Sequence, residues 1–170
     1  EAPATAQTVE PTPIVIGQSY ALPSATYGGP REINVWLPPG YAEGDARYPV
    51  LYLLDGGVVF QDFHHISGLA QLGTVNGTTR DIIVVGIASR DRRNELALPT
   101  QNAELIARYP TQGQSEQFRA FVRDEVQPWV EATFRTDGTD TLMGESLAGL
   151  FVVETFLKAP QMFDAYVAVS

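Results

Sequence analysis

The stretch Asp140–Glu154, DTLMGESLAGLFVVE, decides the predicted fold. Its apolar start indicates a short buried strand and the run from Leu147 onward indicates a helix, so a sharp turn must join them. Ser146 stands at this turn, with Gly144 two residues before it and Ala148 two residues after it. Such a turn holds a serine in a strained backbone conformation and lifts its hydroxyl above the sheet. Because the turn brings the two flanking residues together, both must be small, and glycine and alanine are.

Apolar strands and helical patterns alternate along the rest of the chain. Two continuous apolar runs, Val50–Leu54 and Ile82–Val85, are typical of strands buried on both faces. Upstream, the alternating segments 14–22 and 32–37 flank a Tyr-Gly-Gly-Pro turn and predict an antiparallel hairpin. The sequence therefore predicts an α/β fold, with a mainly parallel sheet, helices on both faces and an antiparallel N-terminal edge.

Three helices are predicted from apolar residues that recur at spacings of three and four. They cover residues 58–72, 115–134 and 147–158. Pro128 is expected to kink or divide the second of them. Residues 87–113 show no clear periodicity and predict a long loop, with one helical turn near 102–108. A last buried strand is expected over residues 163–169.

Three predicted loops meet at one edge of this sheet. They are Asp55–Gly57, residues 87–113 and the turn at Ser146. In open α/β sheets, ligands bind outside the carboxyl ends of the strands, which is where these loops lie. Their convergence favours a catalytic serine over an ordinary tight turn between a strand and a helix.

The composition argues against several classes of function. A net charge of −9, without a basic run, argues against binding to a phosphate backbone. The sequence has no cysteine and two histidines, which excludes zinc–thiolate and disulfide chemistry and argues against a His-rich metal site. No apolar run is long enough to cross a bilayer. We therefore expect no metal, cofactor, nucleic-acid partner or membrane span.

Residues 1–12 are rich in alanine, proline and threonine and lack periodicity. This pattern predicts a flexible leader before a folded domain at residues 13–170. Such a leader often remains after a secretory signal is removed, so we expect a secreted or periplasmic protein, with a cytoplasmic location as the alternative.

Five segments, in chain order, resemble the putative-esterase group of the α/β-hydrolases. They read VLYLLDGG, DRRNELALPT, FVRDEVQPWVEATFRTD, LMGESLAGLF and FDAYVAVS. The group includes siderophore-trilactone esterases, the esterase D type and feruloyl esterases. The resemblance implies an α/β-hydrolase-like fold and hydrolysis of a small-molecule ester through an acyl-enzyme. Ser146 would be the nucleophile, and the backbone N–H groups of Leu147 and Gly57 would be the oxyanion donors. The group usually has glycine where this chain has Ala148.

The acid and the general base of such a hydrolase follow the serine in the sequence. No histidine follows Ser146, and the acids that do follow are Glu154 and Asp164. Glu154 is expected too far along its helix to serve a base. His64 and His65 are expected in the middle of a helix, either exposed or at the pocket rim, and neither is expected to be the base. Since serine without a base is a weak nucleophile, we expect a larger hydrolase, in which a further segment or a second chain completes the sheet and the triad.

Three arginines in the 87–113 loop are candidate substrate-binding residues: Arg90, Arg92 and Arg93. Guanidinium groups recognise carboxylate, phosphate and phenolate groups, so this reading implies an anionic group on the ester and a higher KM in Arg90→Ala. The alternative is ion pairing with nearby acids: Asp91, Glu95 or Asp81. Glu145, beside the serine, is either a further substrate contact or a solvated turn residue.

Two other functions remain open on the sequence. The fold also hosts non-catalytic domains that bind a ligand or partner. An acyltransferase or a peptidase would use the same serine. A fluorophosphonate probe separates a binding domain from a catalytic one, because a catalytic serine is labelled and the label is lost in Ser146→Ala. Product analysis with an added alcohol separates acyl transfer from hydrolysis.

Overall fold

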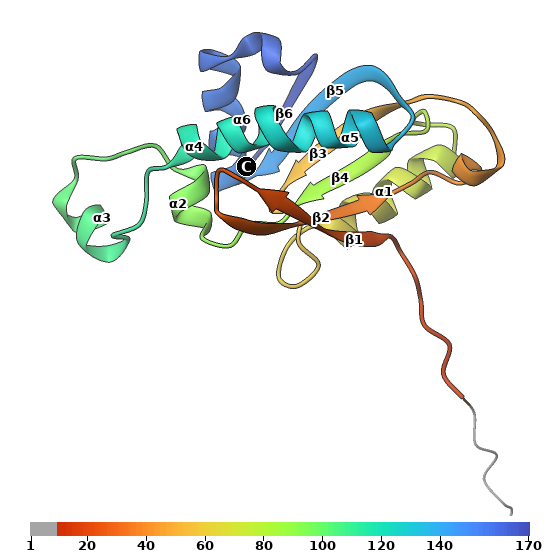
Figure 1. Ribbon diagram of the computed structural model, residues 1–170, viewed down its shortest axis with the longest axis horizontal. Coiled ribbons are helices and arrows are strands. Elements are labelled where there is room, and N and C mark those ends of the chain that lie inside the picture. The colour runs from red at the N-terminus through yellow and green to blue at the C-terminus, as the bar shows by residue number, and fades with distance from the viewer. Residues whose placement is uncertain (1–9) are drawn as a thin grey trace, which may run out of the picture.

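A computed structural model describes residues 10–170 of the protein, so most of the predicted leader lies outside the described residues. Six strands form one sheet in the order β1-β2-β4-β3-β5-β6 (Figure 1). The strands are β1 (Gln18–Ser24), β2 (Gly29–Trp36), β3 (Tyr48–Leu54), β4 (Ile83–Ile87), β5 (Thr136–Glu145) and β6 (Ala165–Val169).

The sheet confirms the predicted α/β class. β4, β3, β5 and β6 are parallel neighbours, whereas β1 and β2 form the antiparallel edge. Pairing with β2 begins at Gln18. The first strand therefore starts later than predicted, because Ile14 and Val15 lie before this pairing and are largely exposed. The parallel arrangement brings the carboxyl ends of β3, β4 and β5 to one edge, as expected.

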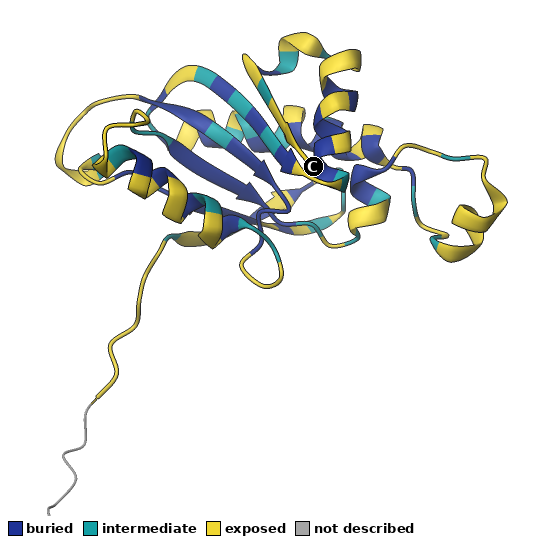
Figure 2. Ribbon diagram, turned by 180° about the vertical axis from the view of Figure 1, so that it is seen from behind, coloured by how far each residue is buried: buried dark blue, intermediate teal, exposed yellow. Residues whose placement is uncertain are grey.

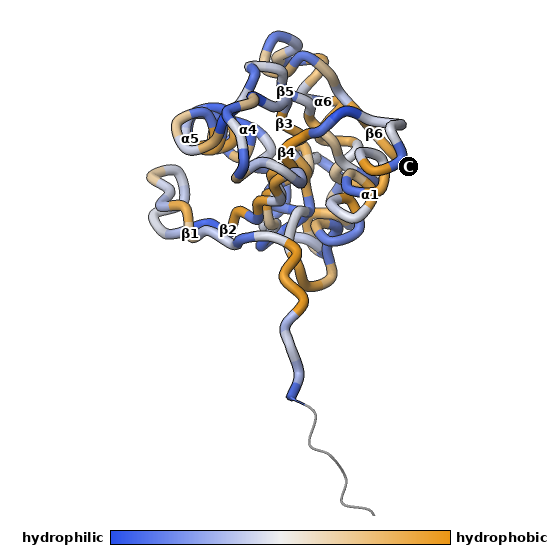
Figure 3. Tube along the Cα trace, turned by 90° about the vertical axis from the view of Figure 1, so that its right-hand side faces the viewer, coloured by the Kyte–Doolittle hydropathy of each residue, from blue (hydrophilic) through white to orange (hydrophobic). Residues whose placement is uncertain are grey.

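Helices cover both faces of the sheet, which also confirms the prediction (Figures 1 and 3). α1 (Phe63–Val75) packs on one face, where Phe63 and Ala70 join buried side chains from β2, β3 and β4. The other face carries α4 (Ser115–Phe121), α5 (Gln127–Thr133) and α6 (Leu147–Lys158). Within residues 10–170, no helix combines the length and the apolar character needed to span a bilayer.

Short helices interrupt the predicted loop at residues 87–113. α3 (Ala103–Arg108) confirms the predicted helical turn. α2 (Arg92–Leu96) was not predicted, because a helix of five residues is too short to show periodicity. A contact with the sheet holds α2 in place: the buried carboxylate of Glu95 accepts a hydrogen bond from Arg31 of β2 at 2.9 Å.

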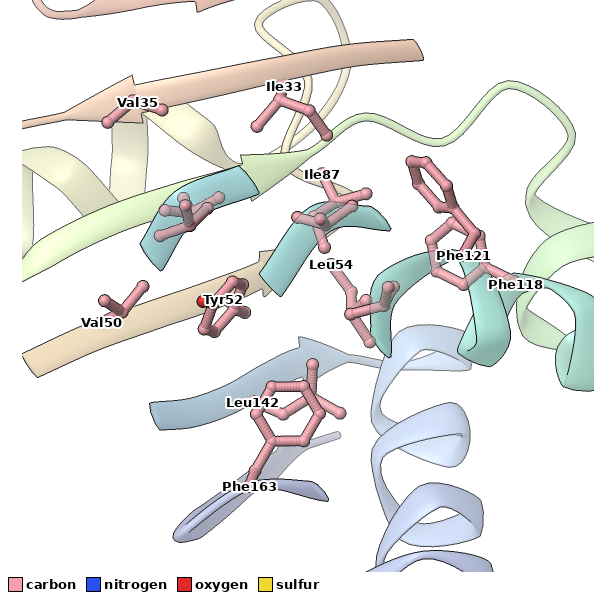
Figure 4. Close-up of a cluster of buried hydrophobic side chains, with 14 of the residues drawn as sticks. Ile33, Val35, Val50, Tyr52, Leu54, Ile87, Phe118, Phe121, Leu142 and Phe163 are labelled. Carbon is pink, nitrogen blue, oxygen red and sulfur yellow. The ribbon is translucent and has the colours of Figure 1, made fainter. Parts of the chain in front are cut away.

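The main core lies between the sheet and the face that carries α4, α5 and α6 (Figure 4). Leu54 and Ile87 are register partners on neighbouring strands and point toward Phe121. Phe118, Phe121 and Leu142 are completely buried. Burying a side chain of this size stabilises the fold by about 1.5–3 kcal/mol. The apolar strands β3 and β4 run through the centre of the molecule (Figure 3).

Residues 115–133 form one helical run that contains a π turn at Val122–Val126. The N–H of Gln127 donates to the carbonyl oxygen of Val122, five residues earlier. Pro128 follows, and it has no N–H and crowds the carbonyl four residues before it. The wider π turn accommodates that misfit, so the helix is divided near Pro128 as predicted.

β6 is an exposed edge strand, whereas a buried strand was predicted (Figure 2). Val167 and Val169 are each 39% exposed. One side of β6 pairs with β5, and within residues 10–170 no strand pairs with its other side. The apolar composition that predicted burial is therefore unmatched by neighbours in the described part of the chain. An unpaired apolar edge of this kind is prone to association.

Asp140 is a buried acidic residue in the middle of β5. Burial raises the pKa of its carboxyl to about 6. The negative charge of Glu131 adds to this rise, and a hydrogen bond from Gln127 partly offsets it by lowering the pKa. Since the folded state holds this proton more tightly than the unfolded state, stability falls as the pH rises from about 4 through 6. We expect Asp140→Asn to raise the free energy of unfolding at pH 7 by about 1–3 kcal/mol, and to have much less effect at pH 4.

Urea unfolding at pH 4, 5, 6 and 7 measures this difference. The exposed substitution Asp45→Asn is the control and should show no comparable trend. A difference between Asp140→Asn and the unaltered protein that stays constant with pH contradicts the assignment.

Candidate functional site

Ser146 occupies the predicted turn between β5 and α6. Its backbone has φ 58° and ψ −116°, a conformation that is costly for any residue except glycine, and the residue is exposed. Its N–H donates to the carbonyl oxygen of Val169 at 2.8 Å, and its carbonyl accepts from the N–H of Leu150 at 3.0 Å. β6 and α6 thus hold the turn from two sides. The predicted conformation of this turn is confirmed.

The small residues on either side of the turn are in contact. A Cβ added to Gly144 would lie 2.7 Å from the carbonyl carbon of Ala148 and 2.8 Å from its Cβ. Atoms do not approach this closely, so position 144 requires glycine. Ala148 is completely buried, and a larger side chain there would push α6 away from β5.

Leu147 is the first residue of α6. The first N–H groups of a helix have no acceptor within the helix and point out of its N-terminus. The Leu147 N–H therefore lies directly beside the serine and is available to an oxygen held there.

The loop after β3 also contains a strained residue. Asp55 has φ 50°, and the next residue, Gly56, donates from its N–H to the carbonyl oxygen of Ile87 at 2.9 Å. A Cβ on Gly56 would lie 2.2 Å from the Cα of Gly86, so glycine is required where the ends of β3 and β4 meet. The N–H of Gly57 donates to Oε1 of Gln61 at 2.8 Å. An incoming oxyanion at Gly57 would have to replace that amide oxygen.

Gln61 is a residue that the sequence did not identify. Its Oε1 also accepts from the N–H of Ser89 at 3.1 Å, and its Nε2 donates to the carbonyl oxygen of Ser89 at 3.0 Å. One side chain thus joins the loops after β3 and β4. A lone glutamine in a glycine-containing loop gives no sequence signal for this role, because the contacts are made to a segment 28 residues away.

Each of the three candidate arginines has a different partner. The Arg90 guanidinium donates to the carbonyl oxygen of Pro30. Arg93 lies over the ring of Tyr109, with 4.4 Å from its guanidinium carbon to the ring centroid.

Arg92 contacts both loops of the site. Its Nε donates to Oδ2 of Asp55 at 2.6 Å, and its Nη2 donates to the carbonyl oxygen of Glu145 at 3.3 Å. For Arg92, the alternative of ion pairing with Asp91, Glu95 or Asp81 is wrong, because its ion-pair partner is Asp55. Glu145 itself is exposed beside the serine, and the contact recorded here is made by its backbone.

A pocket of about 330 Å³ lies between the loops that follow β3 and β4. Its lining residues are Asp55, Phe60, Gln61, Asp62, Ser89, Arg90 and Arg92. The structure thus brings Arg90, Arg92 and the loop after β3 around one cavity, and Arg92 also contacts the Ser146 turn through the carbonyl oxygen of Glu145. Arg93 has its contact with Tyr109, beyond α2, instead.

The histidines lie elsewhere. His64 and His65 are in the first turn of α1, not in the middle of a helix as predicted. Their rings are 3.9 Å apart between centroids, and Nδ1 of His65 lies 3.6 Å from Oδ1 of Asp62. His64 lines a separate cavity with the segment that leads into β1. These contacts give neither ring a link to the serine.

Glu154 has a structural role. Burial alone would raise the pKa of its carboxyl, but hydrogen bonds from Lys158 and Arg119 hold that pKa below its ordinary value. The ion pairs measure 2.9 Å to Lys158 and 2.7 Å to Arg119. Glu154 therefore ties α6 to α4. Among residues 10–170, no group of three or more His, Cys, Asp or Glu side chains is placed to hold a metal ion.

Comparison with known proteins identifies relatives. Ferri-bacillibactin esterase BesA of Bacillus subtilis (strain 168) is 30% identical over 136 residues, which cover 72% of this chain and 47% of that protein. The crystal structure of an IroE-like serine hydrolase from Shewanella oneidensis is 32% identical, with a TM-score of 0.74, and the match covers 89% of this chain and 49% of the other.

Siderophore hydrolase EstA from Aspergillus nidulans shares the fold at 20% identity, with a TM-score of 0.79 over 96% of this chain and 61% of the other. The chain spans about half the length of the curated relatives it matches. Residues 24–170 match the family described as "Putative esterase". The chain has an α/β-hydrolase-like fold and belongs to this esterase family.

Proposed function

We propose that the full-length protein is a serine-dependent carboxylic ester hydrolase that works through an acyl-enzyme. The observation that carries this proposal is Ser146, exposed and strained at the tip of the turn between β5 and α6. In the proposed reaction its hydroxyl oxygen attacks the ester carbonyl carbon, the alcohol leaves with a proton, and water then releases the acid from the serine.

The carbonyl oxygen becomes an oxyanion during each step. The Leu147 N–H, at the start of α6, and the Gly57 N–H, after β3, are its proposed donors. One such donor is worth roughly 10²–10³ in kcat in enzymes that use them. At Gly57 the oxyanion would take the place of the Gln61 side-chain oxygen.

The general base and the acid are proposed to come from outside these 170 residues. His64 and His65 contact each other, Asp62 and the segment before β1, and Glu154 is held by Arg119 and Lys158. The open apolar edge of β6 offers a place for a further strand. Additional chain, or a second chain, that pairs there could deliver both groups to the carboxyl edge of the sheet.

The proposed substrates are esters of the siderophore class. Relatives are named for ferri-bacillibactin and for siderophore triacetylfusarinine C. Arg90 lines the pocket formed by the loops after β3 and β4, and a guanidinium there would suit an anionic group on the substrate.

The test is product analysis with the full-length protein in H₂¹⁸O, with p-nitrophenyl butyrate and ferric bacillibactin as substrates and glycerol as a competing acceptor. Hydrolysis gives an acid that carries ¹⁸O. A glycerol ester as the main product would identify an acyltransferase instead. Binding without turnover of either substrate would identify a binding domain and refute the proposal.

A further inference from the structure

Two residues with positive φ follow the carboxyl ends of the neighbouring strands β3 and β5. The strands are parallel neighbours, with Leu53 opposite Met143. Asp55 and Ser146 follow with φ values of 50° and 58°. The proposed oxyanion donors, at Gly57 and Leu147, come shortly after them. The relative position of these two loops therefore decides whether both N–H groups can reach one oxygen.

One side chain bridges the two loops. The Arg92 guanidinium donates to the Asp55 carboxylate at 2.6 Å and to the carbonyl oxygen of Glu145, the residue before the serine, at 3.3 Å. A guanidinium is planar and its N–H groups have fixed directions, so it holds two acceptors in a defined geometry. We propose that Arg92 is a positioning residue that fixes the Asp55–Gly57 loop against the Ser146 turn. This inference rests on the proposed function.

The Asp55 carboxylate depends on this contact. Its side chain is 8% exposed, and its Oδ1 is buried without a hydrogen-bond partner among the described residues. A buried charge without a partner is costly, so Arg92 is what keeps this carboxylate, and with it the strained loop, in place.

Arg92 is itself presented from a fixed support. It is the first residue of α2, whose preceding residue, Asp91, accepts a hydrogen bond from the N–H of Asn94 at 3.1 Å. Glu95 anchors the same helix to the buried Arg31 of β2 at 2.9 Å. The buried Arg31–Glu95 ion pair thus fixes α2, and α2 holds Arg92 where it contacts both loops.

This role differs from substrate binding in what it predicts for kinetics. Oxyanion donors act in the transition state, so loss of their alignment lowers kcat and leaves KM nearly unchanged. Loss of a substrate anchor raises KM. A misplacement of about 1 Å in an active site can cost roughly 100-fold in rate.

The experiment is a double-mutant cycle in the full-length protein with Arg92→Ala, Asp55→Asn and both together. Asparagine tolerates a positive φ, so Asp55→Asn keeps the backbone and removes the charge. We expect each single variant to lower kcat roughly 10- to 100-fold with KM within about threefold, and the double variant to be no worse than either. Arg92→Lys should recover part of the loss. Arg123→Ala removes an exposed arginine paired with Asp124 and is the matched control.

A readout without catalysis keeps this inference separate from the proposed function. Hydrogen exchange at residues 55–62 and 143–150 should become faster in both Arg92→Ala and Asp55→Asn and stay unchanged in Arg123→Ala. Unchanged exchange at both loops overturns the inference, whether or not the protein is an esterase. A rise in KM at constant kcat, or fully additive losses, overturns it as well. Full ester hydrolysis by Ser146→Ala would instead refute the proposed function.

Discussion

Replacing Ser146 with alanine is expected to lower kcat for ester hydrolysis by about 10⁴- to 10⁶-fold in the full-length protein. The substitution removes the oxygen that would form the acyl-enzyme, and in serine hydrolases this single change costs about as much as removing all the catalytic groups. KM should change little, because the proposed donors and the pocket remain. Steady-state kinetics with p-nitrophenyl butyrate measures both constants.

The same position provides a test of strain that does not depend on activity. With φ at 58° and ψ at −116°, Ser146 has a conformation that glycine adopts without cost. We therefore expect Ser146→Gly to be as inactive as Ser146→Ala and more stable by about 1 kcal/mol or more in urea unfolding. Equal stability of the two variants would contradict the strain at this turn.

The second large effect is expected from Gly144→Ala. The added Cβ would lie 2.7 Å from the backbone of Ala148, so the turn or the start of α6 must move. Overpacking of this kind costs about 1–3 kcal/mol in stability. The displacement also moves Ser146 and the Leu147 N–H, and we expect kcat/KM to fall roughly 100-fold or more.

Two variants check this explanation. Gly68→Ala makes the same chemical change in α1, where an added Cβ meets no atom within 4 Å, and it should leave kcat/KM unchanged. Adding Ala148→Gly to Gly144→Ala removes the contact between Cβ atoms but leaves the 2.7 Å contact with the backbone. Rescue should therefore be partial. Full activity of Gly144→Ala alone would contradict this explanation, because the turn would then accommodate the added Cβ without moving Ser146.

The fold was largely predictable because its signals are local. The apolar runs at β3 and β4 and the small residues around Ser146 indicate buried parallel strands and a tight turn without knowledge of distant contacts. β6 was harder, because an apolar run predicts burial and cannot show which neighbour provides it. α2 was missed because Arg31, not helical periodicity, stabilises it.

The candidate site was predictable only in part. The turn that carries Ser146 could be found from spacing, since sterics restrict the residues around it. The contacts of Gln61 and Arg92 could not, because each joins segments far apart in the sequence. For Arg92, the acids considered as ion-pair partners were near it in the sequence, whereas the observed partner is Asp55, 37 residues away.

The central claim is that the hydroxyl at position 146 is the nucleophile, and covalent trapping tests it most directly. The full-length protein is treated with a fluorophosphonate, and the modified peptide is sequenced by mass spectrometry while residual ester hydrolysis is followed. We predict one adduct, on Ser146, whose formation parallels the loss of activity. An adduct on another residue, or complete inactivation while Ser146 stays unmodified, would contradict the claim.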